Sequence, residues 1–458
     1  MRISQLFFSS AALAALVACG GAKPKSGLGP GGGKDVPPPP PIVSDSGSGG
    51  GGDAKAEPKR EISKDERRDY DGAMDQFEKN EKAGSWNESA CRSSADRFAS
   101  VVRSHPQMVE AQYMVGLSYQ RCNLASDTER AYQAALKIKP SHGQSLSNLG
   151  ELYYRAGKVD GAKQYWDSAI KANGKLIAAR INIASMELEQ MRKLVAHSPE
   201  WKKLEEDARF QLSSTLGVDS DSYHAYTTYG LIYMEGWQKN KNRLDLARLL
   251  LDEGKKRQEK FAPLQNAYGL LYMHRNALSE ALKHFQAAVE LDPKFVEARM
   301  NVGLTTLGFR NYNLAKDQFG EVLKLQPKNY DALIGLGNAL RGLNDFEGAE
   351  REYKKAKDID GKRGEAFYNL GVLFKDFRAT KQPPQESIAT YNVAKQYFQD
   401  FQNKQADPKD IAEAKEQVAL ITKTVTQTQK FLQTMANQPP TPAAPPASAP
   451  APGDAPKK

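Results

Sequence analysis

The 458-residue sequence has few of the residues on which catalytic and metal sites depend. It contains three cysteines and six histidines. No pair of histidines has the spacing of a metal site with a third ligand near it. The histidines lie at unrelated positions: His105, His142, His197, His224, His274 and His284. His142 is expected in solvent beside a turn, and His274 at a helix end, where a cation suits the helix dipole.

A phosphate-binding loop is also missing. The glycine runs lie between residues 20 and 60, with no strand before them and no helix after them. We therefore predict no catalytic residue, no metal, no cofactor and no small-molecule substrate. The net charge of +9 is spread along the chain rather than clustered, which favours an ordinary solvated surface over a specific polyanion site.

A long apolar run is absent as well. The mostly apolar segment Leu6–Ala18 follows Arg2 and precedes Cys19. It has the form of a secretory signal and is too short to cross a membrane as a finished helix. Its end resembles the bacterial lipobox, in which the cysteine is acylated and becomes the first residue of the mature protein. Residues 1–18 are therefore expected to be a lipoprotein signal peptide; the alternative is an ordinary signal peptide cut nearby.

The predicted anchor sets the expected location. Gly20 follows Cys19, where an aspartate would by family analogy retain a lipoprotein at the inner membrane. The chain is thus expected at the outer membrane, attached to lipid through acylated Cys19 and facing the periplasm. Export to that compartment excludes nucleic acid as a partner. Residues 19–60, rich in glycine and proline, and residues 438–458, rich in proline and alanine, are predicted to be a disordered linker and tail.

What the sequence does contain is a repeat. A small residue recurs after an apolar one, with an aromatic residue following in most units and an alanine and an aromatic further on. The last four small residues are spaced 34 apart. A small residue on one helix lets the next helix approach, and the aromatic fills the gap beside it. The small residues are Gly116, Gly150, Ala184, Gly230, Gly269, Gly303, Gly337 and Gly371.

This pattern resembles the tetratricopeptide repeat (TPR) family. The resemblance implies an all-α, right-handed solenoid of about eight helix pairs over residues 61–437. The first unit is atypical, because its first helix, residues 64–82, has no small-residue mark. The spacing places extra residues near 186–216 and 237–242, and an interruption at 382–384. A C-terminal capping helix is expected over about residues 409–434.

Two further cysteines, Cys91 and Cys122, fall within the repeats. The repeat frame places them on the same edge of the solenoid, one on the second helix of the first unit and the other at the end of the next helix. An exported chain enters an oxidising compartment. We predict a disulfide between them; the alternative is two free, half-buried thiols.

The family resemblance also implies a partner-binding groove along the first helices of the units. Asparagines at the sixth helix position resemble those that hold a peptide backbone in other TPR grooves. Apolar side chains would form the floor and acidic ones the margin, which suits a partner segment bearing lysine or arginine. The alternative is that the next repeat or the tail covers the apolar residues. The candidates are Asn148, Asn182, Leu270, Met300, Asn301, Leu304, Ile334, Asn338, Tyr368, Asn369 and Val372, with Glu297, Asp331 and Glu365 at the margin.

The lipobox, the linker, the enlarged units and the tail together resemble the TPR lipoproteins of the adventurous gliding motility machinery of myxobacteria. That resemblance implies a non-enzymatic scaffold within a trans-envelope complex, bound to other envelope proteins of the same assembly. Two other functions stay open: a pilotin-like factor that carries a secretin or β-barrel to the outer membrane, and a regulator of cell-wall enzymes.

Overall fold

The computed structural model describes residues 63–404 and 408–437, and within these ranges it contains helices and no strand. The predictions for the signal peptide, Cys19, the linker and the tail lie outside the described residues. The chain divides into two compact units, the first ending at Gly335 and the second beginning at Leu336.

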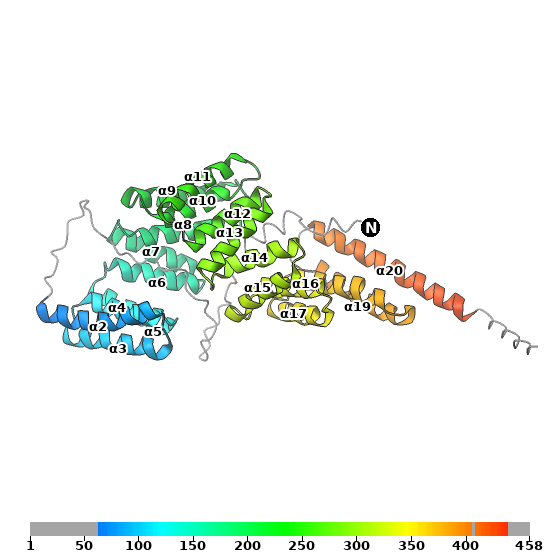
Figure 1. Ribbon diagram of the computed structural model, residues 1–458, viewed down its shortest axis with the longest axis horizontal. Coiled ribbons are helices and arrows are strands. Elements are labelled where there is room, and N and C mark those ends of the chain that lie inside the picture. The colour runs from blue at the N-terminus through cyan, green and yellow to red at the C-terminus, as the bar shows by residue number, and fades with distance from the viewer. Residues whose placement is uncertain (1–62, 405–407, 438–458) are drawn as a thin grey trace, which may run out of the picture. The chain divides into compact units, whose positions relative to one another are not determined.

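Consecutive helices pack against each other in pairs (Figure 1). The described residues contain nine pairs and a final helix, where about eight pairs were expected. The pairs are α2 (Lys64–Ala83) with α3 (Glu88–Ser104), α4 (Val109–Gln120) with α5 (Ala125–Ile138), α6 (Gly143–Arg155) with α7 (Val159–Ala172), α8 (Ile177–Met191) with α9 (Pro199–Val218), α10 (Tyr223–Met234) with α11 (Asn242–Arg257), α12 (Ala262–His274) with α13 (Leu278–Leu291), α14 (Val296–Gly308) with α15 (Tyr312–Leu325), α16 (Tyr330–Gly342) with α17 (Phe346–Ile359), and α18 (Glu365–Val372) with α19 (Pro384–Gln402); α20 (Pro408–Ala436) follows. The predicted fold class is confirmed.

The glycines of the repeat lie where the two helices of a pair touch. A Cβ atom added to Gly337 would lie 2.4 Å from Cε1 of Tyr353, and one added to Gly303 would lie 2.8 Å from Cε1 of Phe319. Both rings are fully buried. Close packing of an aromatic ring against bare backbone is therefore the physical origin of the 34-residue pattern.

Leucine at Gly337 is expected to lower the free energy of unfolding by about 1 to 3 kcal/mol, because the ring of Tyr353 cannot move away without disturbing its own packing. Gly303→Leu should act in the same way through Phe319. Gly320→Leu is the matched control, since a Cβ at Gly320 would meet nothing within 4 Å. Thermal unfolding followed by circular dichroism measures the effect; equal melting of all three variants would contradict the packing.

The turns between the two helices of a pair use residues with a positive φ angle. Asn276 has φ 59°, Arg310 has φ 58° and Asn344 has φ 64°. Each of them follows the last turn of the first helix, where a left-handed residue lets the backbone close the helix end. The amide of Asp345 then bonds the carbonyl of Leu340 at 2.9 Å. A repeated local turn thus sets the geometry of these pairs.

The enlarged units appear where the spacing predicted them. Helix α9 has 20 residues, against 14 in α7 and α13. Residues 192–198 join α8 to α9, and residues 235–241 join α10 to α11. The first helix and the capping helix also lie close to their predicted bounds.

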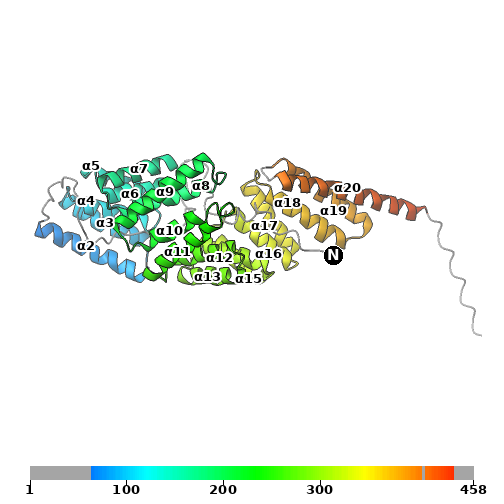
Figure 2. The ribbon, with the colours of Figure 1, turned by 90° about the horizontal axis from the view of Figure 1, so that it is seen from above.

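In the second unit, α18 continues as a π-helix, η1 (Leu373–Arg378), and a short 3-10 helix, η2 (Ala379–Lys381). Helix α19 starts at Pro384, so the predicted interruption at 382–384 is the joint between them. Helix α20 packs on α19, and its C-terminal part extends beyond the N-terminal end of α19 (Figure 1 and Figure 2).

Candidate functional site

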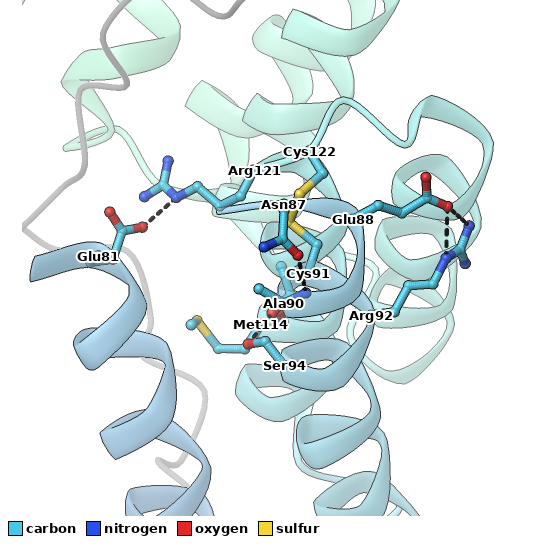
Figure 3. Close-up of a disulfide and its surroundings, with 11 residues drawn as sticks. Glu81, Asn87, Glu88, Ala90, Cys91, Arg92, Ser94, Met114, Arg121 and Cys122 are labelled. Carbon is cyan, nitrogen blue, oxygen red and sulfur yellow. Dashed lines mark hydrogen bonds and ion pairs between the residues drawn. A yellow bond between two sulfur atoms is a disulfide. The ribbon is translucent and has the colours of Figure 1, made fainter. Parts of the chain in front are cut away.

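A disulfide joins the first two helix pairs. Cys91, near the start of α3, is bonded to Cys122, just after α4, with the two Cα atoms 6.2 Å apart (Figure 3). Cys91 is fully buried. Beside it, Asn87 accepts a hydrogen bond from the amide of Ala90 at 2.9 Å and caps α3. The disulfide ties the atypical first helix pair to the second helix pair.

The asparagines predicted to line the partner groove are mostly bonded within the protein. Asn148 donates to the hydroxyl of Tyr132 at 2.9 Å, and Asn301 donates to Asn266 at 2.9 Å. Asn338 accepts from Tyr353 and Asn369 donates to the carbonyl of Glu365. Asn182 is half-buried, and its side chain makes no hydrogen bond within the described residues. Asn148 and Asn301 therefore connect neighbouring helix pairs, whereas Asn182 keeps its hydrogen-bonding groups for a partner.

The apolar floor of the predicted groove needs correction in the first unit. Met300 is 2% exposed, and Leu270 belongs to the core around α12 and α13. Neighbouring helices therefore cover both side chains, as the alternative interpretation proposed. Leu304 and Ile334 are half-buried and stay partly accessible.

In the second unit, the candidates Tyr368 and Val372 are half-buried. The hydroxyl of Tyr368 donates to Glu413 of α20 at 2.5 Å, and its ring lies 5.4 Å from those of Phe398 and Phe401. Val372 packs in the same cluster. Helices α19 and α20 thus contact the face of α18 that the sequence assigned to a partner and leave it only partly accessible.

Of the acidic margin, Glu297 is exposed to solvent at the start of α14. Although this side chain is reached by solvent, the protein mass around its carboxyl partly desolvates it and raises its pKa, and the negative charges of Glu189 and Asp292 raise the pKa further. Carboxylates from α8 and α14 therefore share one region of the first unit, in keeping with a surface that favours cationic side chains.

Two loops of the enlarged units form a second, unpredicted surface. We call residues 192–198 and 235–241 the paired-loop surface. Val195 is 76% exposed and Leu194 is 40% exposed at the tip of the first loop. Lys239 donates to the carbonyl of Ala196 at 3.1 Å, and Nε2 of His197 lies 3.1 Å from the carbonyl oxygen of Gly236. The two loops are thus held together, while apolar side chains project from them.

Charged contacts fix the base of this surface. Nε of Arg192 lies 2.8 Å from Oε1 of Glu235. Behind it, Arg243 is buried and donates to Glu205 at 2.6 Å, to the carbonyl of Glu235 at 2.7 Å and to that of Ile232 at 3.2 Å. This network joins α9, α10 and α11. The paired-loop surface is consequently presented by a rigid base, as protein-binding sites commonly are.

The sequence carried only a weak signal for these residues. The broken spacing marked the insertions, but no repeat position describes Leu194 and Val195, since they lie outside the 34-residue unit. Their exposure depends on how the two loops pack against each other, which is a feature of the tertiary structure.

Two histidines differ from the sequence prediction. His142 is 8% exposed rather than solvated, and its Nδ1 lies 2.8 Å from the hydroxyl of Ser145 and accepts from that residue's amide. Desolvation, aided by Lys139, lowers the pKa of His142 to about 4. Desolvation, aided by Arg192, also lowers the pKa of His274 to about 4, so this residue does not place a cation at the helix end. Within the described ranges, no group of three His, Cys, Asp or Glu side chains is arranged to hold a metal ion.

The buried histidine gives a pH dependence with a definite sign. The pKa of His142 is lower in the folded chain than in the unfolded chain, so the unfolded chain binds the extra proton. Stability is therefore complete above pH 6.5 and falls as the pH drops toward 4. Between pH 7 and pH 5 we expect His142 to cost about 2 kcal/mol. His142→Asn keeps a capping side chain that does not titrate, and thermal unfolding across this range should be flatter by that amount; an unchanged slope would contradict it.

None of the helices in the described part of the chain is both long and apolar enough to span a membrane.

Two segments of the chain match the model of a known protein family. The family model of the tetratricopeptide repeat matches residues 123–176 and 303–364, which include parts of both compact units. No curated protein matches the chain.

Solved structures of similar chains are distant. A tetratricopeptide repeat protein from Parabacteroides merdae is 17% identical with a TM-score of 0.41, covering 58% of this chain and 99% of its own. Pseudomonas aeruginosa PilF is 15% identical with a TM-score of 0.38, covering 52% and 98%. A thermophilic TPR protein from Thermus thermophilus is 20% identical with a TM-score of 0.37, covering 43% and 99%.

Proposed function

We propose that this chain, which is built from tetratricopeptide repeats, is a non-enzymatic scaffold held at the outer membrane by acylated Cys19 and facing the periplasm. Repeat solenoids of this kind present extended surfaces to protein partners. The finer proposal is that it serves a trans-envelope motility complex and binds other envelope proteins of that assembly.

The observation that carries the scaffold function is the paired-loop surface. Val195 is 76% exposed on a loop whose position is fixed by hydrogen bonds to the loop of the next helix pair. An apolar side chain that is both exposed and held in place loses little conformational entropy when a partner covers it. The partner contact is therefore proposed at this surface rather than along the covered floor of the groove.

The disulfide supports the proposed compartment. Cys91 and Cys122 are bonded, and disulfides persist in oxidising compartments such as the periplasm. This agrees with the export predicted from residues 1–18.

Substitution of the anchor tests the location. Cys19→Ala should move the protein from the outer-membrane fraction to the soluble fraction, or leave it unprocessed, because the acyl chains provide the attachment. Membrane fractionation with a salt wash reads the result. Complete retention of the variant on the membrane after the wash would refute anchoring through Cys19.

Capture of partners tests the surface. Val195→Glu should reduce at least tenfold the envelope proteins recovered with the mature, acylated chain, because it places a charge on an apolar contact. Val218→Glu is the matched control: Val218 is 46% exposed at the end of α9. Equal recovery with both variants would place the contact elsewhere.

Deletion of the whole protein from the cell separates the three functional classes. Without a motility scaffold, the cell is expected to lose gliding while the multimers of other envelope proteins still assemble. Loss of a secretin or barrel multimer would instead indicate a pilotin-like factor. Direct binding to purified cell-wall synthases would indicate a regulator of cell-wall enzymes.

A further inference from the structure

A groove in the second unit has no role in the proposed function. It lies between the start of α19 and the C-terminal half of α20, with a volume of about 390 Å³. Pro384, Tyr391 and Phe431 give it an apolar lining, and Gln382 and Gln427 are polar residues that line it. We call it the α19–α20 groove.

Phe431 is the unusual member of this lining. The buried positions of α20 are Ala414, Ile421 and Val425, which pack on the second unit. Phe431 is 53% exposed, although it lies only six residues after Val425 and borders the groove. An aromatic ring left half in water at the edge of a groove is an anchor for a bound segment.

The serine and threonine hydroxyl groups at the contact of α19 with α20 are already bonded to helix carbonyls. Thr424 donates to Leu420 at 3.0 Å, Thr428 donates to Thr424 at 2.9 Å, and Ser387 donates to Pro384 at 2.9 Å. They therefore offer no free proton to a ligand.

Amide groups supply the donors instead. The side-chain oxygen of Gln382 accepts from Thr390 at 2.5 Å, which leaves the N–H groups of that amide to donate. Gln427 is exposed, and its side chain makes no hydrogen bond within the described residues. The groove consequently combines aromatic faces with amide donors.

This combination fits a proline-rich segment. Proline has no backbone N–H, so such a segment brings carbonyl acceptors and apolar rings. In the polyproline II conformation every third residue lies on one face, and aromatic grooves bind these faces. The donors of Gln382 and Gln427 complement the carbonyls, while Tyr391 and Phe431 complement the rings.

The chain carries such a segment directly after α20. Pro439, Pro442 and Pro445 are spaced every third residue in the sequence that follows. From the end of α20 back to Gln427 is about 15 Å at the helical rise. About five residues of polyproline II span that distance, so this part of the sequence is long enough to reach the groove.

We propose that the α19–α20 groove binds the chain's own C-terminal proline-rich segment, residues 438–458, within the same molecule. The proposal does not depend on the membrane anchor or on the paired-loop surface.

A peptide of residues 438–458 tests the groove. It is labelled and titrated, by fluorescence anisotropy, into the chain ending at Asn437 and into the full chain. We expect saturable binding to the shortened chain and at least tenfold weaker binding to the full chain, whose own segment occupies the groove. Phe431→Ala in the shortened chain should weaken binding at least tenfold. Leu420→Ala, at a 50% exposed position of the same helix, should leave it unchanged.

A second measurement addresses binding within one molecule. Amide hydrogen exchange of residues 424–431 should be at least threefold slower in the full chain than in the chain ending at Asn437. Equal exchange in the two chains, or equal peptide binding by Phe431→Ala and its parent, would overturn the proposal. Slower exchange that appears only at concentrations where the chain dimerises in sedimentation would also overturn it, because the segment would then bind a second copy.

Discussion

Arg243→Met is expected to lower the free energy of unfolding by about 3 to 5 kcal/mol. Arg243 and Glu205 are both 8% exposed, so methionine would leave the Glu205 carboxylate buried without a cation. The carbonyls of Glu235 and Ile232 would lose their donor as well. The guanidinium also lies 5.4 Å from the ring of Trp201, so a stacking contact is lost too. The loss should be large because desolvated groups, once unpaired, cannot return to water.

Urea unfolding followed by circular dichroism measures this effect. Arg248→Met is the matched control: Arg248 is about half exposed and, among the described residues, forms an ion pair only with Asp252, at 3.7 Å, so its loss should cost under about 1 kcal/mol. The double variant Arg243→Met with Glu205→Met removes both charges and should recover much of the stability. A single Arg243→Met variant that unfolds like its parent would show that the network is not buried in solution.

Phe285→Ala and Phe319→Ala are each expected to cost about 3 to 5 kcal/mol. Both rings are fully buried and lie against the glycines of the first helices, Gly269 and Gly303. Alanine would leave a cavity beside bare backbone, which has no side chain to fill it. Because a repeat is held mainly by its neighbours, the adjacent pairs should loosen as well.

Surface phenylalanines give the comparison for these core variants. Phe210, on α9, is 64% exposed, and Phe309, after α14, is 45% exposed. Their alanine variants should stay within about 0.5 kcal/mol of the parent. If the Phe285→Ala variant had the same melting temperature as the Phe210→Ala variant, the assignment of Phe285 to the core would be wrong.

The sequence did not predict the burial of the groove residue Met300. Met300 occupies a position that faces the groove in the repeat frame, so Met300→Glu would have been a surface variant. At 2% exposure it is a core variant and should unfold its unit. The frame gives the direction of a side chain from its own helix, but whether other helices cover that side chain is decided by the tertiary structure.

The sequence by itself determined the fold. The 34-residue spacing, the glycines and the aromatics fix the helix pairs, since these are local requirements of helices packing at close distance. The insertions, the capping helix and the bonded pair Cys91 and Cys122 were readable for the same reason: each follows from position along a regular repeat.

The tertiary structure alone decided which surfaces are free. Tyr368 is half-buried because Glu413 of α20 and two rings of α19 contact it. Val195 is exposed on a loop that the bonds of Lys239 and His197 hold against another loop. His142 is neutral because neighbouring side chains exclude water from it. Exposure, pairing and pKa depend on groups brought together from different repeats, and a periodic sequence does not encode these groups position by position.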